Sequence, residues 1–135
     1  MSRRDSRIYA MGVAYRKELG TQDEPTILDE EPQEADREFA EALLRHLDAS
    51  QEAYREAIQG LLKDWTFQRL GYLERSILLL GFAELENFSE IPLKASLDEW
   101  VDLAKSYCGQ EAKKLVNGVL NQYKNQLVRE GRRSE

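Results

Sequence analysis

The chain is poor in the residues that build disulfides, metal sites and tight turns. Its 135 residues include one cysteine (Cys108), one histidine (His46) and three prolines. A single cysteine excludes an internal disulfide and a cysteine-rich zinc site, and a single histidine excludes a histidine pair at metal-ligand spacing. Because prolines are few and no segment alternates strongly between apolar and polar residues, the sequence predicts an all-α fold.

Long apolar runs and catalytic motifs are also missing. The longest apolar run, residues 77–83, is far shorter than the roughly 20 residues of a membrane span. Residues 1–7 contain no apolar core of the kind found in a signal peptide. We therefore expect a cytoplasmic protein that does not enter a membrane. Without a Gly-rich phosphate loop or a Gly-x-Ser-x-Gly motif, the sequence argues against an enzyme and indicates no cofactor, metal or catalytic residue.

One strongly apolar segment, residues 73–86, is expected to organise the fold. It contains the consecutive residues Ile77, Leu78, Leu79 and Leu80. Successive residues of an α-helix are about 100° apart, so four in a row cover most of its circumference and the helix must be buried on nearly every side. Leucines and the absence of proline favour a helix over a strand. The charged residues near its ends are expected at the surface; they are Glu74, Arg75, Glu84 and Glu86.

Apolar residues that recur every three or four positions predict the other helices. Together with the central helix they make a compact bundle of about seven helices, arranged as one domain of two subdomains. We expect the N-terminal subdomain over residues 1–63, with an acidic loop at 20–35, and the C-terminal subdomain over 64–130, followed by a frayed tail at 130–135. The expected helices span 5–19, 35–47, 51–63, one short turn within 64–71, 73–86, 93–107 and 110–129.

The charge is unevenly distributed along the chain, although the net charge is −6. Residues 1–19 carry five basic and two acidic side chains, 20–36 carry seven acidic and no basic ones, and 111–135 carry six basic and three acidic ones. Basic residues in the first turns of a helix oppose its dipole. The arginines of the first helix therefore either bind an anion or form a solvated basic tail. Whether they share one patch with Lys113 and Lys114 depends on whether the two helix starts meet in the fold.

Several short runs stand in the order and spacing of a known protein family. Those between Trp65 and Leu120 are Trp65, Arg69-Leu70, Leu73-Glu74-Arg75-Ser76-Ile77-Leu78, Glu84-Leu85, Ile91-Pro92, Lys94, Glu99, Leu103-Ala104-Lys105 and Lys114-Leu115-Val116-Asn117-Gly118-Val119-Leu120. Near the start, Arg3-Arg4, Arg7, Ala10 and Tyr15 fall where the family has an arginine-rich first helix ending in an aromatic residue. In these residues the chain resembles the transcription antitermination factor NusB family.

The resemblance implies a compact all-helical fold and a role in the regulation of transcription. Family members bind the single-stranded boxA element of ribosomal-RNA leader transcripts together with NusE, a protein of the small ribosomal subunit. The pair joins the antitermination complex of RNA polymerase and suppresses premature termination. By position, the RNA-binding residues would be Arg3, Arg4, Arg7, Lys113, Lys114 and Asn117, and the NusE-binding residues would be Tyr15, Leu19 and Glu74.

Two departures from the family pattern support an alternative function. Leu79 stands where an arginine is common, which removes a candidate RNA contact, and Leu115 replaces a common aromatic that could stack on a base. The alternative is a helical protein–protein adaptor of the same fold that binds NusE but not RNA. The surface meant for NusE could also support a homodimer. The sequence leaves open the oligomeric state, the preferred boxA variant and the role of the acidic loop.

Overall fold

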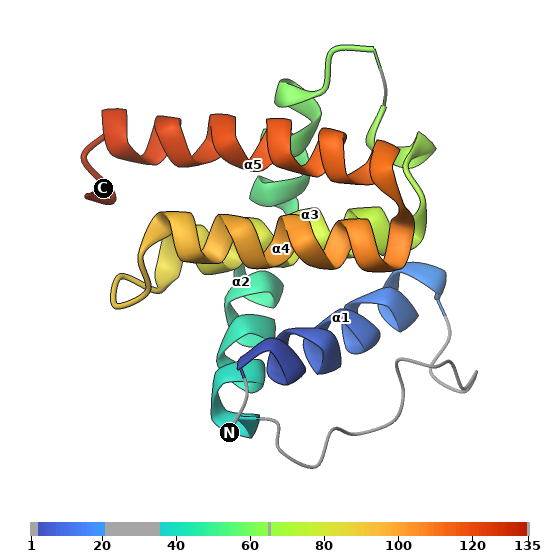
Figure 1. Ribbon diagram of the computed structural model, residues 1–135, viewed down its shortest axis with the longest axis horizontal. Coiled ribbons are helices and arrows are strands. Elements are labelled where there is room, and N and C mark those ends of the chain that lie inside the picture. The colour runs from blue at the N-terminus through green and yellow to red at the C-terminus, as the bar shows by residue number, and fades with distance from the viewer. Residues whose placement is uncertain (1–2, 21–35, 65, 135) are drawn as a thin grey trace.

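The structure is a computed structural model that describes residues 3–20, 36–64 and 66–134, and all of its regular elements within these ranges are helices (Figure 1). They are α1 (Arg3–Leu19), α2 (Arg37–Leu61), the 3-10 turn η1 (Phe67–Arg69), α3 (Tyr72–Asn87), α4 (Leu93–Cys108) and α5 (Gln110–Arg129). The all-α prediction is confirmed for this part of the chain. Most of the expected acidic loop (21–35) and Trp65 lie outside the described residues.

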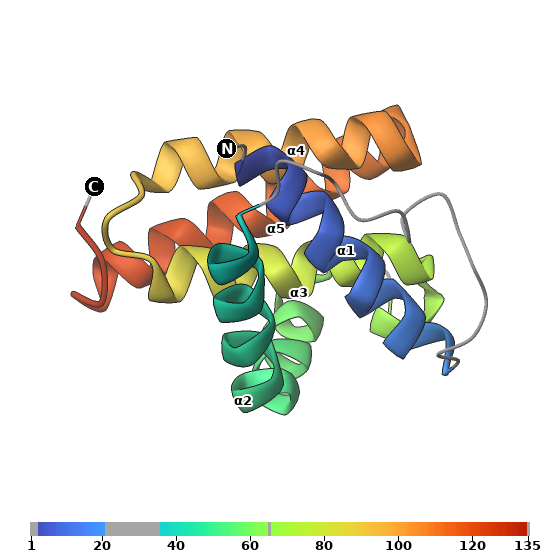
Figure 2. The same cartoon turned by 90° about the horizontal axis from the view of Figure 1, so that it is seen from below.

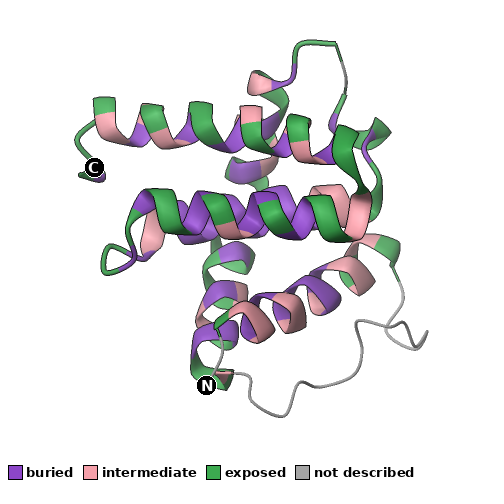
Figure 3. Cartoon of the chain, viewed as in Figure 1, coloured by how far each residue is buried: buried purple, intermediate pink, exposed green. Residues whose placement is uncertain are grey.

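Helix α3 is the centre of the fold, as the sequence predicted. It packs against each of the other four α-helices, and all residues from Ser76 to Leu85 are buried. Figures 1 and 2 show α3, α4 and α5 running alongside one another, while α2 crosses them steeply. Buried residues gather along α3 and along the sides of α4 and α5 that face it (Figure 3). A helix that is apolar all round is thereby covered all round.

The number of helices differs from the prediction of about seven. The described residues form five α-helices and one 3-10 turn, because the expected helices 35–47 and 51–63 follow each other as the two halves of one kinked helix, α2. A kink at Ser50, with φ of −124° and ψ of 20°, marks the position where the sequence suggested a break. The buried residues Leu43, Leu47, Tyr54 and Ile58 keep helical spacing across the kink. Both halves of α2 therefore present one continuous apolar stripe to the core.

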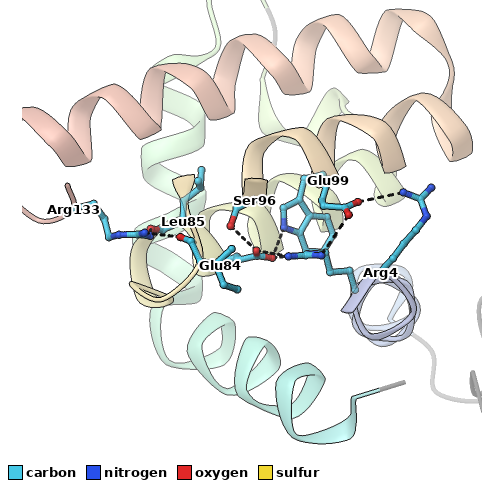
Figure 4. A network of polar contacts seen from close by, with 9 residues as sticks. Arg4, Glu84, Leu85, Ser96, Glu99 and Arg133 are labelled. Carbon is cyan, nitrogen blue, oxygen red and sulfur yellow. Dashed lines mark hydrogen bonds and ion pairs between the residues drawn. The ribbon is translucent and has the colours of Figure 1, made fainter. Parts of the chain in front are cut away.

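The described residues after α5 are held against the fold, whereas the sequence led us to expect a frayed tail over 130–135. Arg133 is buried, and its guanidinium donates to the carbonyl oxygens of Leu85 at 2.6 Å and Ile91 at 2.7 Å (Figure 4). The neighbouring Arg132 forms an ion pair with Glu86. These contacts fasten the tail to the C-terminal end of α3 and to the turn before α4.

Within residues 3–20, 36–64 and 66–134, no helix combines the length and the apolarity that crossing a membrane requires.

Candidate nucleic-acid interface

The three arginines of α1 that the sequence selected lie in three different environments. Arg3 is exposed, and its guanidinium carbon lies 4.7 Å from the ring centroid of Phe39. Arg4 keeps 39% of its side chain exposed and reaches across to α4. Arg7 keeps only 4% of its side chain exposed. Two of the three arginines are therefore available to solvent.

Arg7 belongs to the core rather than to the surface. Its Nε and Nη2 donate to the two carboxylate oxygens of Glu84, at 2.8 Å and 2.7 Å. Glu84 is fully buried and also accepts hydrogen bonds from Ser96 Oγ at 2.5 Å and from Trp100 Nε1 at 2.9 Å (Figure 4). A guanidinium whose fork is occupied inside the protein cannot also hold a phosphate in solvent. The predicted RNA contact of Arg7 does not fit this geometry, and neither does the expected surface position of Glu84.

Arg4 is positioned by two carboxylates of α4. Its Nη1 donates to Asp102 Oδ2 at 2.8 Å and to Glu99 Oε2 at 3.3 Å. The other oxygen of Glu99 lies 4.0 Å from Nη1 of Arg7. Glu99 therefore links the buried ion pair to the exposed arginine, and the start of α1 is fixed against the middle of α4.

The predicted residues of α5 share one face near its start. Lys113 and Lys114 precede Asn117 by four and three residues, the spacing at which helical side chains are neighbours. Lys114 and Asn117 are exposed, and Lys113 is partly buried. This face belongs to the first turns of α5, which begins directly after α4.

A sharp turn at Gly109 joins the two helices. Its φ of 97° favours glycine, and its N–H donates to the carbonyls of Ala104 and Lys105, which closes α4. Asp102, which holds Arg4, precedes Gly109 by seven residues, about 10 Å at ~1.5 Å per residue. Arg4 thus contacts the α4 arm of this hairpin, and the two lysines lie on its α5 arm, beyond the turn.

A cavity of about 570 Å³ lies where the start of α3, the end of α4 and the start of α5 meet. It brings together Lys114, which was predicted to bind RNA, and Glu74, which was predicted to bind the partner protein. A second cavity of about 340 Å³ shares Lys114 and Leu115 with the first and continues along α5 to Gln122. The lining residues of the first cavity are Arg69, Leu70, Glu74, Cys108, Glu111, Ala112, Lys114 and Leu115.

The other predicted partner-binding residues lie at the end of α1. Leu19 is 37% exposed and Tyr15 is partly buried. One further residue at this end, Tyr72 at the start of α3, was not predicted from the sequence. Its side chain is 43% exposed, and its ring centroid lies 4.7 Å from the guanidinium carbon of Arg75. The end of α1 and the start of α3 lie at the same end of the molecule in both views (Figures 1 and 2). The sequence feature that could have indicated Tyr72 is its position as an aromatic residue directly after Gly71, in the break before the central helix.

The two departures from the family pattern have different structural meanings. Leu79 is 1% exposed and lines a small gap with Ala14, Leu44 and Leu47 inside the α1–α2–α3 core. Leu79 is therefore a core residue in this chain and contributes nothing to the solvent-exposed surface. Leu115 is partly buried between the two cavities of α5. Its replacement of an aromatic residue does change the wall of the candidate interface.

The cavity does not supply an activated nucleophile. Burial, and then the nearby carboxylate of Glu74, raise the pKa of the Cys108 thiol from 9.0 to about 11. The thiol is therefore protonated at neutral pH and unreactive. In the described part of the chain, no group of three or more histidine, cysteine, aspartate or glutamate side chains could hold a metal ion. The charged and apolar side chains around this open cavity are instead suited to binding a ligand or a partner.

Comparison with known proteins agrees with the helical arrangement and with the motifs. The model of the NusB family matches residues 4–125. The transcription antitermination protein NusB of Bacillus cereus (strain B4264) is 32% identical over 130 residues, which cover 94% of this chain and 100% of that protein. The structure of T. maritima NusB has a TM-score of 0.78 and 26% identity, covering 93% of this chain and 92% of that one. A chain in the structure of the antitermination factors NusB and NusE in complex with double-stranded RNA has a TM-score of 0.75 and 31% identity, with coverage of 92% and 96%. The family match over most of the sequence, the full-length relative and the shared fold show that this chain belongs to the NusB family.

Proposed function

We propose that the protein is a transcription antitermination factor that binds single-stranded boxA RNA of ribosomal-RNA leader transcripts together with NusE. In the cytoplasm the pair would join the RNA polymerase antitermination complex and suppress premature termination. Family membership and a related structure of NusB and NusE with RNA support the proposal. The observation that carries it is the docking of Arg4 on the α4–α5 hairpin that presents Lys113 and Lys114.

The proposed RNA surface consists of Arg3, Arg4, Lys113, Lys114 and Asn117, without the buried Arg7. An arginine suits this role because its planar fork pairs with a phosphate and also stacks on a base. Lysines add point charges, and an asparagine amide can bond the exposed edge of an unpaired base. The surface contains both groups that neutralise the backbone and one group that can read a base.

The proposed NusE surface consists of Tyr15, Leu19, Tyr72 and Glu74. Leu19 and Tyr72 are the large apolar side chains that stand exposed within the described residues. Exposed apolar side chains next to a carboxylate are typical of a protein interface with an apolar centre and a polar rim. Because Glu74 and Lys114 border one cavity, NusE and RNA would bind at adjoining positions.

A fluorescence titration of labelled boxA RNA tests the RNA part of the proposal. Contact with about three to five phosphates gives a log–log salt slope near −2 to −3.5, at roughly −0.7 per phosphate. The combined substitution Arg3→Ala, Lys113→Ala and Lys114→Ala is expected to weaken binding and to make the slope less steep by about 2. The exposed Arg45, Lys105 and Arg129, changed together to alanine, remove the same number of positive charges and serve as the control. Unchanged binding by the triple variant contradicts the proposed surface.

The choice of RNA in this titration separates the forms that the protein could recognise. A scrambled strand of the same composition measures sequence preference, and a duplex of the same length tests the single-strand preference. Preference for the unpaired boxA strand supports the proposal. Equal binding to all three shows a basic surface without boxA recognition.

The alternative function is that of a helical adaptor that binds NusE and does not itself bind RNA. The observation that favours it is the pairing of Arg4 with two carboxylates, which offsets positive charge at the proposed RNA surface. A pull-down with NusE separates the two functions. The adaptor would retain NusE and show no preference for boxA over the scrambled strand, and loss of NusE in a Leu19→Asp variant would locate the interface. Sedimentation of the protein with and without NusE would show whether the same surface also forms a homodimer.

A further inference from the structure

Arg4 is the proposed RNA contact whose charge is already engaged within the protein. Its Nη1 donates to Asp102 at 2.8 Å and to Glu99 at 3.3 Å, and Figure 4 shows the contact with Glu99. All three side chains remain open to solvent: Arg4 is 39% exposed, Glu99 37% and Asp102 56%. A phosphate that approaches Arg4 therefore meets a guanidinium with two carboxylates beside it.

We propose that Asp102 and Glu99 compete with RNA phosphate for the Arg4 guanidinium and thereby set the affinity of the protein for RNA. The inference rests on the proposed function, because it assigns a role to residues around the same RNA surface. In the free protein the carboxylates hold Arg4 against α4. Binding of RNA exchanges one anionic partner of Arg4 for another.

The exchange is feasible because the ion pairs are exposed. Ion pairs in solvent contribute little to stability, and breaking one changes an equilibrium by about two- to fivefold. The buried pair of Arg7 and Glu84, with 4% and 0% of the side chains exposed, could not exchange in this way. The structure thus places one arginine where it holds the fold and another where a carboxylate can be displaced.

Competition for a phosphate contact should affect every RNA equally. Phosphate contacts position a nucleic acid but carry no sequence information, which is read from the edges of the bases. Removing the competing carboxylate should therefore raise affinity for boxA and for a scrambled strand by the same factor. In this role Asp102 and Glu99 limit binding to RNA in general and leave the preference for boxA to other contacts.

Asp102 offers the cleaner test of the two carboxylates. Glu99 also lies 4.0 Å from Nη1 of the buried Arg7, so changing it could disturb the core. Asp102→Asn keeps the shape of the side chain and removes its charge. Asp98→Asn is a matched control, because Asp98 lies four residues earlier on the same face of α4 and pairs with Lys94 at 2.8 Å.

The experiment is a titration of fluorescein-labelled boxA and scrambled RNA with the wild-type protein, Asp102→Asn and Asp98→Asn, each with Arg4 and with Arg4→Ala. We expect Asp102→Asn to tighten binding by about two- to fivefold on both strands and Asp98→Asn to have a smaller effect. In the Arg4→Ala background the gain from Asp102→Asn should vanish. Thermal unfolding of Asp102→Asn should show equal or slightly lower stability, so a gain in affinity would not reflect a more stable fold.

Several results would overturn the inference. They are unchanged or weaker binding by Asp102→Asn, an equal gain from Asp98→Asn, or a gain that persists in Arg4→Ala, which would show simple repulsion between Asp102 and RNA. If the wild-type protein binds neither strand, the proposed function itself fails. Binding by the wild-type protein without an Arg4-dependent gain leaves the proposed function intact and removes the role of Asp102.

Discussion

Arg7 of α1 and Glu84 of α3 form a two-pronged ion pair inside the core, with Nε–Oε1 at 2.8 Å and Nη2–Oε2 at 2.7 Å. Ser96 and Trp100 of α4 add two further hydrogen bonds to the same carboxylate. A buried charge is costly unless it is paired and fully hydrogen-bonded, and this carboxylate meets both conditions. One side chain of α3 therefore holds α1 and α4 together, which fixes the direction in which Arg3 and Arg4 leave the start of α1.

Removing one partner of this pair should destabilise the protein strongly. Arg7→Ala would leave the carboxylate of Glu84 buried without its counter-charge, and breaking such a pair costs about 3–5 kcal/mol. Urea unfolding followed by circular dichroism measures the change. The control is Arg4→Ala, whose exposed ion pairs contribute about 0–1 kcal/mol. Similar small losses in both variants would show that Arg7 does not hold α1 in place.

This ion pair also marks the limit of what the sequence could predict. The central helix was expected over 73–86 and found as Tyr72–Asn87, and the last helix was expected over 110–129 and found as Gln110–Arg129. Such elements follow from apolar periodicity, which is a local property of the chain. Arg7 and Glu84 are 77 positions apart, and no local pattern shows that they meet. A charged residue at the end of an apolar helix was therefore assigned to solvent although the fold buries it.

The candidate site was predictable to a similar extent. Charge clustering drew attention to the basic residues at the starts of α1 and α5, and the family resemblance supplied their RNA-binding role and added Asn117, Tyr15, Leu19 and Glu74. The pairing of Arg4 with Asp102 and the common cavity of Glu74 and Lys114 depend on contacts between helices, which only the fold supplies. The division into two subdomains stays a prediction.

The tail offers a second test of stability. Arg133→Ala would remove two charge-assisted hydrogen bonds, to the carbonyls of Leu85 and Ile91. Bonds to charged groups contribute about 1.5–3 kcal/mol each, and each loss should lie near the lower end of this range because truncation of Arg133 would let water reach the two carbonyls. Urea unfolding measures the loss, and the exposed Arg129→Ala is the control. A variant as stable as the control would show that the tail is not fastened by Arg133.

Two helical glycines should respond to alanine in opposite ways. A Cβ atom at Gly81 would lie 2.9 Å from Cδ2 of the fully buried Leu120, so α3 and α5 would have to separate slightly. Overpacking of this kind costs about 1–3 kcal/mol, which exceeds the gain in helix propensity of roughly 0.5–1 kcal/mol. At Gly60 no atom lies within 4 Å of the added Cβ, so Gly60→Ala should stabilise the protein by the propensity gain alone. Thermal unfolding of both variants tests the close approach of the two helices, and equal shifts of the same sign would contradict it.

The Cys108 thiol should react slowly with alkylating reagents. Burial and the carboxylate of Glu74 raise its pKa from 9.0 to about 11. At pH 8 the thiolate fraction would fall from about 10% to about 0.1%, so alkylation by iodoacetamide should be roughly 100-fold slower in the folded protein than in urea.

The stability of the fold should also depend on the ionisation of Cys108. Between about pH 9 and 11 the folded state keeps a proton that the unfolded state has lost, so the free energy of unfolding should fall as the pH rises.

Substitution of Glu74 separates the two causes of the raised pKa of the Cys108 thiol. Because burial is the larger cause, Glu74→Gln should lower the pKa of Cys108 only in part and accelerate alkylation at pH 8 modestly, without reaching the rate in urea. Glu111→Gln is the matched control, since Glu111 lines the same cavity and does not contribute to the shift. The pH dependence of the free energy of unfolding between pH 9 and 11 should weaken in Cys108→Ala. An alkylation rate in the folded protein close to that in urea would show an exposed thiol and an open cavity wall at the point where α4 meets α5.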